Sequence, residues 1–430
     1  MHPLLAWPYA AAAATADLLA RTPLPGQGKL ARSLRARRGV LARFTDWGHA
    51  HRDPSRPLLW MHAPSVGEGL QARPVIERLR AERPDVQIAY TLFSPSAERF
   101  AASLGADFTD YLPFDRTSSA HSALDALRPT ALVFVKLDLW PALVAAAHAR
   151  GVRIGIISAT LATGSGRRGP LARALLREAY AALDAVGAID TGDAERLGLL
   201  GVARERIVVT GDTRYDQVAA RTAATDRASA LLAPLASARP TLVAGSTWPA
   251  DEAVLLTAWR DIRRAVPDAR LVIAPHEPRP THLDPIRRWA ASSGLALDAL
   301  DDAGATTDVV LVDRVGVLGE LYALADVAYV GGGFHAAGLH SVLEPAAFGA
   351  PVLFGPRHKN SRDAGLLIAC RGGEAVTDSA SCARAARIVL TEADTRRRAG
   401  IAARTLVENG LGAAVQSTDL VEALLRRHAV

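Results

Sequence analysis

The chain has 430 residues and a formal net charge of +6, with 49% hydrophobic and 22% charged residues. These proportions exclude disordered and collagen-like classes, and two cysteines are too few for a disulfide framework. The length corresponds to about two to three domains. The basic excess favours an anionic partner, which leaves nucleic acid, a membrane surface and a phosphorylated substrate open.

Residues 1–50 are predicted to form an apolar and basic segment that associates with a membrane. Residues 4–20 are apolar except for Asp17. Basic residues follow this run instead of preceding it, which is opposite to a signal peptide and keeps the rest of the chain in the cytoplasm. An anionic leaflet would attract such a segment. The alternative is a packed helix with a solvated basic face. The basic residues are Arg21, Lys29, Arg32, Arg35, Arg37, Arg38 and Arg43.

From residue 58 onward, short apolar runs alternate with helical patterns. This alternation predicts parallel sheets covered by helices on both faces. We expect two doubly wound, Rossmann-like domains, 51–220 and 240–405. The last helical pattern covers about 395–428, and the C-terminal helix at 406–430 has two possible partners, of which the N-terminal domain is one. Ligands of such sheets bind at the carboxyl ends of the strands, here in a cleft between the halves. Strands are predicted at 58–61, 86–91, 131–135, 152–158, 185–189, 207–209, 241–244, 270–274, 309–312, 327–330 and 351–354.

The loop at 62–69 follows the first strand and contains Glu68 between Gly67 and Gly69. A carboxylate at a helix start is stabilised by the helix dipole, and partial burial raises its pKa toward the range of a general base. The alternative is structural, because Ser65 and Glu68 also have the spacing of a capping box.

A second candidate lies at 330–356, where a strand is followed by a glycine-rich loop and a short helical stretch. Backbone N–H groups there suit a phosphate, and Glu344 can accept hydrogen bonds from ribose hydroxyls. A tight turn is the alternative. The loop residues are Gly331, Gly332, Gly333, Gly338, His340 and Ser341.

Smaller polar groups also follow predicted strands. They are Ser246 and Thr247, Pro275 and His276, and the pair Lys136 and Asp138, for which a buried ion pair is the structural alternative. The sequence has no P-loop, no GxGxxG at a strand end and no metal-binding motif, so we expect neither a metal nor a cofactor. Aromatic residues are only 5% of the chain, which argues against nucleic-acid binding.

Several motifs, in order over nearly the whole chain, resemble those of the 3-deoxy-D-manno-octulosonic acid (Kdo) transferases. This resemblance implies a GT-B fold with an N-terminal membrane-associated helix. It also implies inverting transfer of Kdo from CMP-Kdo to a lipid A precursor, in lipopolysaccharide biosynthesis. The location implied is the cytoplasmic face of the inner membrane, with peripheral attachment or a single N-terminal anchor. The motifs are WMHAPSVGEG, YLPFD, VKLDLWP, VTGDTRYD, AGSTWPADE and GGGFHAAGLHSVLEPAAFGAPVLFGP.

The resemblance also assigns roles to matching positions. Glu68 would be the general base, and Glu344 would bind the ribose. The acceptor side would use Ser65, Gly67, Lys136 and Asp138. The donor side would use Ser246, Thr247, Pro275, His276, Gly331, Gly332, Gly333, Gly338, His340 and Ser341.

Three positions depart from the family pattern, in which Asn, Glu and Asn are usual where this chain has Ser341, Asp138 and Ala142. Two alternatives therefore stand beside the Kdo transferase hypothesis. One is a GT-B enzyme that uses a UDP-sugar on another lipid acceptor. The other is a non-catalytic nucleotide-binding paralogue.

Overall fold

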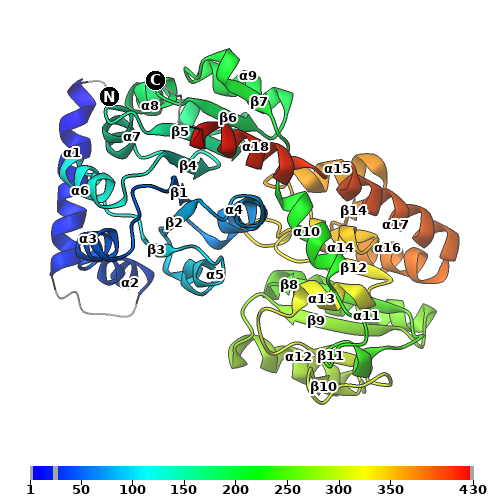
Figure 1. Cartoon of the computed structure of the whole chain (residues 1–430). Helices are drawn as coiled ribbons and strands as arrows, with labels where there is room; N and C mark the ends of the chain where they lie inside the picture. Colours follow the sequence, from blue (N-terminus) through cyan, green and yellow to red (C-terminus); the bar gives the residue numbers. More distant parts are fainter. Residues whose placement is uncertain (1–2, 23–27, 427–430) are drawn as a thin grey trace. The chain divides into compact units, whose positions relative to one another are not determined.

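The computed structural model describes residues 3–22 and 28–426 and divides into two compact units (Figure 1). Unit 1 comprises Met1–Gln217 and Leu411–Val430, and unit 2 comprises Val218–Gly410. Each unit is built around one seven-stranded sheet in which all neighbouring strands are parallel. The predicted class, two doubly wound α/β domains, is confirmed.

The sheet of unit 1 has the order β3-β2-β1-β4-β5-β6-β7. Its central strands are continuous apolar runs because helices cover both faces. Helices α4 and α18 lie side by side over one face, and α3, α6, α7 and α8 form a row over the other. The strands are β1 (Leu58–His62), β2 (Gln87–Leu92), β3 (Phe108–Tyr111), β4 (Ala131–Val135), β5 (Arg153–Ala159), β6 (Ala185–Ala188) and β7 (Ile207–Val209).

The helices of unit 1 are α1 (Pro3–Arg21), α2 (Lys29–Ala36), α3 (Val40–Ala50), α4 (Val66–Glu82), α5 (Glu98–Ala102), α6 (Thr117–Leu127), α7 (Pro141–His148), α8 (Pro170–Ala181), α9 (Thr191–Leu199) and α18 (Ala413–Leu425). Helix α10 (Arg214–Ala223) begins in unit 1 and ends in unit 2. Short 3-10 turns are η1 (Pro95–Ala97), η2 (Gly166–Arg168) and η3 (Arg204–Arg206). None of the helices in the described residues is long and apolar enough to cross a bilayer.

The sheet of unit 2 has the order β10-β11-β9-β8-β12-β13-β14. Its strands are β8 (Thr241–Thr247), β9 (Arg270–Pro275), β10 (Leu297–Ala299), β11 (Val309–Leu311), β12 (Val327–Val330), β13 (Val352–Phe354) and β14 (Gly373–Ala375). Its helices are α11 (Pro249–Ala265), α12 (Pro280–Ser292), α13 (Leu318–Leu321), α14 (Leu343–Ala347), α15 (Arg362–Cys370), α16 (Ser379–Thr391) and α17 (Ala393–Glu408), with the turns η4 (Ala233–Leu235) and η5 (Tyr322–Leu324).

Strand order reverses once in each sheet, between β1 and β4 in unit 1 and between β8 and β12 in unit 2. The chain leaves these neighbouring strands toward opposite faces, which opens a crevice at their carboxyl ends. The topology therefore selects four loops for ligand binding, namely those that follow β1, β4, β8 and β12.

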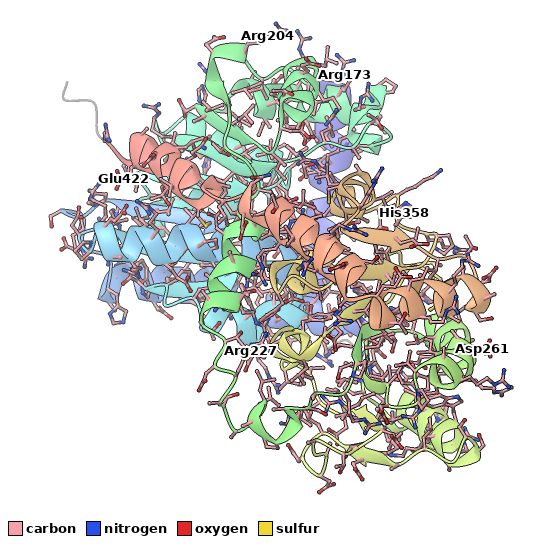
Figure 2. The ribbon with its side chains drawn as sticks, turned by 90° about the vertical axis from the view of Figure 1, so that its right-hand side faces the viewer. Arg173, Arg204, Arg227, Asp261, His358 and Glu422 are labelled. Atoms are coloured by element: carbon pink, nitrogen blue, oxygen red, sulfur yellow. The ribbon has the colours of Figure 1, made fainter. Side chains whose placement is uncertain are left out.

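Helix α18 belongs to the core of unit 1 although it follows unit 2 in the chain. Figure 2 shows α18, which carries the labelled Glu422, alongside α4. Its buried Leu420 and Leu424 pack over Gly155 of β5, where a side chain would collide with Leu424. The Asp216 carboxylate accepts hydrogen bonds from the N–H groups of Gly412 (2.8 Å) and Ala414 (3.0 Å), and so anchors the start of the helix.

The last helical stretch differs from its expected form. One segment was predicted over about 395–428, whereas the structure has α17 and α18 in different units. Gly412, the N-cap of α18, adopts a left-handed backbone (φ +98°), so one continuous helix cannot run through this position. The predicted terminal helix at 406–430 extends to residues 427–430, which lie outside the described residues.

The N-terminal segment 1–50 contains three helices, α1 to α3, and includes residues 1–2 and 23–27, which lie outside the described residues. One of its basic residues does not contribute to a basic surface, because Arg37 is buried with its guanidinium 3.9 Å from the centre of the Phe93 ring. Arg43 is exposed but pairs with Asp110 (2.6 Å). Arg32, Arg35 and Arg38 are exposed as well.

Candidate functional site

Two clusters of polar residues lie at the carboxyl ends of strands, one at the switch point of each sheet. In unit 1 the cluster follows β1 and β4 and contains Glu68 and Lys136. In unit 2 it follows β8 and β12 and contains Ser246 and the glycine-rich loop. The topology explains why these segments meet, since neighbouring parallel strands end at the same edge.

Glu68 lies in the first turn of α4, at the positive end of the helix dipole. Lys136 Nζ donates to its Oε1 at 2.8 Å, and the Ser65 hydroxyl donates to Oε2. Ser65 is the N-cap of α4 but makes no side-chain hydrogen bond to the helix backbone, so the alternative of a capping box is not realised. Neighbouring Gly67 is exposed.

The pKa of Glu68 reflects two opposing effects. Burial alone would raise the pKa of this carboxyl, but the charge and hydrogen bond of Lys136, with the hydrogen bond from Ser65, outweigh burial and hold it below its ordinary value. Glu68 is therefore ionised at neutral pH and can accept a proton.

Left-handed backbone occurs at non-glycine residues in both clusters. Lys136 has φ +59° and Ser246 has φ +54°. Such conformations cost about 1–3 kcal/mol each and persist where the surroundings enforce them, often at functional sites. At Lys136 the conformation turns the chain out of β4 and places the ammonium group on Glu68.

Asp138 does not pair with Lys136, contrary to the ion pair weighed as a structural alternative. Its Oδ2 lies 3.1 Å from His62 Nε2 and accepts a hydrogen bond from Trp140 Nε1 at 3.1 Å. Burial would raise the pKa of Asp138, but the hydrogen bonds from His62 and Trp140 outweigh burial and hold the pKa below its ordinary value. His62 was not predicted as a site residue.

The GDTR motif supports α4, and its Asp212 and Thr213 are buried. Asp212 accepts a hydrogen bond from Gln71 Nε2 (3.0 Å), and Thr213 Oγ1 donates to the backbone carbonyl of Gln71 (2.7 Å). Arg214 pairs with Asp212 at 2.6 Å within unit 1. The motif thus holds the helix that presents Glu68.

In unit 2, fully buried Asp251 ties together the two loops of the switch point. Its carboxylate accepts hydrogen bonds from the N–H groups of Gly332 (2.7 Å), Phe334 (3.0 Å) and Trp248 (3.0 Å). Sequence reasoning missed this residue, although an acidic side chain at the third position of a helix, here in STWPADE, is typical of N-terminal capping.

The glycines of this loop allow the loops of the switch point to approach each other closely. Gly332 has φ +92°, and a Cβ there would collide with the carbonyl of Gly338. A Cβ on Gly333 would collide with the backbone of Gly355. Asn360 also grips this loop, because its side-chain amide exchanges hydrogen bonds with the N–H and carbonyl of Leu339 (3.1 and 3.0 Å).

Trp248 lies at the centre of a group of stacked rings. His335 stacks on the indole at 4.2 Å and His276 at 4.7 Å, while His340 stacks on His276 at 4.5 Å. Trp248 Nε1 donates to His340 Nε2 (3.0 Å), so the proton of neutral His340 is on Nδ1. Burial, together with the charges of His276 and His335, lowers the pKa of His340 to about 4. His340 is thus neutral at pH 7, and its Nδ1–H is a hydrogen-bond donor.

The remaining residues that were predicted to bind the sugar donor occupy different environments. Thr247 Oγ1 donates to buried Glu252 (2.9 Å), Pro275 ends β9, and Ser341 is exposed. Glu344 accepts a hydrogen bond from Arg221 Nη1 at 3.2 Å. Burial raises the pKa of Glu344 in spite of this arginine, which sequence reasoning did not connect with it. The described residues contain no group of three or more metal-ligating side chains arranged around one point.

Two such sheets, each with loops gathered at its switch point, define the GT-B class of glycosyltransferases and related sugar-nucleotide enzymes. Among solved structures, a putative UDP-N-acetylglucosamine 2-epimerase from Listeria monocytogenes matches with a TM-score of 0.62 and 16% identity. The match covers 86% of this chain and 96% of that chain. At this identity the similarity establishes the fold alone.

Sequence comparison gives the family. Residues 33–217 match the family model for 3-deoxy-D-manno-octulosonic-acid transferase (kdotransferase). The transferase of that name from Bordetella pertussis is 30% identical over 394 residues, which are 89% of this chain and 90% of the relative. The one from Haemophilus influenzae is 27% identical over 402 residues, which are 92% and 94% of the two chains. The chain belongs to the 3-deoxy-D-manno-octulosonic acid transferase family and is a glycosyltransferase, as its motifs predicted.

Proposed function

We propose that this protein transfers Kdo from CMP-Kdo to a lipid A precursor with inversion at the anomeric carbon. The observation that carries the proposal is the ionised Glu68 at the switch point of unit 1, held by Lys136 and Ser65. The similarity to Kdo transferases over most of the chain supports the sugar that is transferred.

Glu68 acts as the general base. As an acceptor hydroxyl attacks the anomeric carbon of Kdo, a new carbon–oxygen bond forms and the bond to the phosphate of CMP breaks. The hydroxyl proton passes to Glu68, and CMP leaves with the bonding electrons. Because Lys136 stabilises the charged carboxylate, Glu68 is available as a base at neutral pH.

The loops of unit 2 bind the donor. The Nδ1–H of neutral His340, which the glycine-rich loop carries, is the group that stabilises the negative charge of the leaving phosphate. Glu344 accepts hydrogen bonds from the ribose hydroxyls, as predicted for its role, and Arg221 orients the carboxylate of Glu344.

We further propose that the protein lies at an anionic membrane surface, on the cytoplasmic face of the inner membrane. Trp7 of α1 is 84% exposed, Leu18 is 63% exposed, and Leu30 of α2 is 74% exposed, next to exposed Arg32 and Arg35. An apolar face beside basic residues suits the headgroup region. A groove of about 640 Å³ beside α1, α7 and α8 has both alanines and polar residues such as Asp115 and Arg116 in its lining, and it offers room for part of an amphipathic acceptor.

The test is transfer of Kdo from CMP-Kdo, generated in the assay, to a tetraacylated lipid A precursor, read by mass spectrometry. Glu68→Gln should lower the rate by roughly 10²- to 10⁴-fold, the usual contribution of one general base, while CMP binding persists. Glu77→Gln, an exposed position on the same helix, is the matched control and should leave the rate unchanged.

A mass gain that disappears with Glu68→Gln but not with Glu77→Gln establishes both the reaction and the base. CMP binding without transfer would favour a non-catalytic paralogue, and stabilisation by UDP in place of CMP would favour a UDP-sugar enzyme. Transfer that survives Glu68→Gln would show that another group takes the proton.

A further inference from the structure

We infer that His62 is a positioning residue for the acceptor, which holds Asp138 through a chain of hydrogen bonds that begins in the core of unit 1. This inference rests on the proposed function, because the inference gives Asp138 the role of binding the acceptor sugar. It concerns the orientation of the aspartate, whereas the proton transfer itself is the role of Glu68.

The chain of hydrogen bonds starts at Trp60, a fully buried residue of β1. Trp60 Nε1 donates to Thr91 Oγ1 at 3.0 Å, and that oxygen lies 3.0 Å from His62 Nδ1. The sheet register sets these partners, since His62 and Thr91 are directly paired on neighbouring strands β1 and β2. Trp60, His62 and Thr91 all have 0% exposed surface, so water does not compete for these bonds.

Hydrogen-bonding capacity then decides where the proton of His62 lies. An indole N–H can only donate, so the Thr91 oxygen is an acceptor from Trp60 and its own proton is available for His62 Nδ1. On the other side, the ionised Asp138 carboxylate can only accept. His62 Nε2, at 3.1 Å from Asp138 Oδ2, therefore carries a proton and donates it.

The result is an aspartate with one engaged oxygen and one that remains available. Oδ2 accepts from both His62 Nε2 and Trp140 Nε1, whereas Oδ1 has no hydrogen bond among the described residues. The side chain of Asp138 is 28% exposed, and Oδ1 is the oxygen whose hydrogen-bonding capacity is left for a ligand. Two donors on one oxygen fix the plane of the carboxylate.

The available oxygen is offered to a hydroxyl or ammonium donor. Asp138 lies two residues after Lys136, whose ammonium group contacts Glu68 at 2.8 Å. The loop after β4 thus supplies two groups. Lys136 is the partner of the base, and the Asp138 carboxylate can accept a hydrogen bond from a neighbouring group of the same substrate. A charged carboxylate of fixed orientation binds a sugar hydroxyl more strongly than a substrate group that has no hydrogen to donate.

Two substitutions of nearly equal size separate positioning from packing. In His62→Gln the amide nitrogen can occupy the place of Nε2 and still donate to Asp138. In His62→Asn the shorter amide reaches only the place of Nδ1. We expect His62→Asn to raise the acceptor KM by about tenfold or more, the scale of one charge-assisted hydrogen bond. His62→Gln should stay within about threefold of wild type, and the donor KM should change in neither variant.

A purely structural histidine would give a different result. Both amides replace an imidazole in the same buried place, so loss of packing would lower thermal stability and activity in both variants alike. Equal acceptor KM values for the Gln and Asn variants would overturn the inference, whether both are raised or both resemble wild type.

A second measurement does not depend on turnover. In the full-length protein labelled with ¹⁵N-histidine, and with His62→Gln used for assignment, His62 should carry its proton on Nε2. The Nε2–H signal should shift in Asp138→Asn. A His62 with bare Nε2 would overturn the inference. If wild type transfers no Kdo but these signals are as expected, then the proposed function fails and the hydrogen-bond chain stands.

Discussion

Glu68 and Lys136 show how a single contact sets the protonation of a candidate base. Partial burial pushes the carboxyl toward the neutral form, while an ammonium group at 2.8 Å pulls it toward the charged form, and the second effect is larger. The outcome is a base that is charged under the conditions in which it must work. The same lysine has a left-handed backbone, which indicates that the loop is shaped to place it there.

Replacing Lys136 by methionine should therefore change the pH dependence of transfer. Without the ammonium group, burial raises the pKa of Glu68 with less opposition. Because only ionised Glu68 accepts the proton, activity falls as the pH drops through this pKa. The acidic limb of kcat/KM should consequently move to higher pH in Lys136→Met, as measured with CMP-Kdo and lipid acceptor between about pH 4 and 9.

The matched control is Lys359→Met, an identical change at an exposed lysine of unit 2, which should leave the limb in place. A limb that stays in place in Lys136→Met as well would mean that a group other than Glu68 controls the profile.

For single residues, the sequence predicts which side chains carry the chemistry better than it predicts which side chains they contact. Glu68 is recognisable from its place after a strand. Its pairing with Lys136, 68 positions along the chain, depends on the adjacency of β1 and β4, which no local pattern reveals. The same holds for Arg221, which contacts Glu344 across 123 positions.

Helix α18 is the element on which the integrity of unit 1 most visibly depends. Its start is anchored by Asp216, and its apolar side chains cover β5 beside α4. Since α4 carries Glu68, α18 supports the candidate site without contributing a residue to it.

Asp216→Ala should lower the free energy of unfolding of unit 1 by about 0.5–2 kcal/mol, the usual cost of losing a helix cap. Urea denaturation followed by circular dichroism measures the change. The comparison is Asp394→Ala, in the first turn of α17, whose side chain is 73% exposed and which should change stability less. Equal losses in the two variants would argue against a special role for the anchor of α18.

Strands were predictable where they form an uninterrupted apolar run, even where they are as short as β7. The buried apolar strands β1, β4 and β12 were found with nearly their observed bounds. The strands β3, β10 and β14 were missed, because they are three or four residues long and contain polar residues such as Asp298 and Glu374. Their extended form depends on pairing with a neighbour more than on their own composition.

At the scale of the whole molecule, large apolar side chains are exposed on several elements, and on α1 and α2 they accompany the exposed arginines of α2. This combination motivates the proposed membrane contact. The paired replacement Trp7→Ser and Leu18→Ser should weaken binding to vesicles that contain anionic lipid by roughly tenfold or more, given the cost of losing two apolar anchors.

Sedimentation with vesicles that contain phosphatidylglycerol measures this binding, and neutral vesicles should bind the wild type less well. Ile401→Ser, at a position of α17 that is 59% exposed, is the control for removing an exposed apolar side chain. If wild type shows no preference for anionic vesicles, or if the paired replacement binds as wild type does, the membrane proposal fails.

The path of the chain through the two units has a consequence for synthesis on the ribosome. Unit 2 is encoded as one uninterrupted stretch, whereas α18, which completes unit 1, follows it. During translation the strands of unit 1 emerge first, yet they must wait for almost 200 further residues before the helix that covers β5 is made. The second unit to emerge is thus the first that can finish folding, and the nascent first unit leaves an apolar surface uncovered for the time that its partner helix takes to arrive.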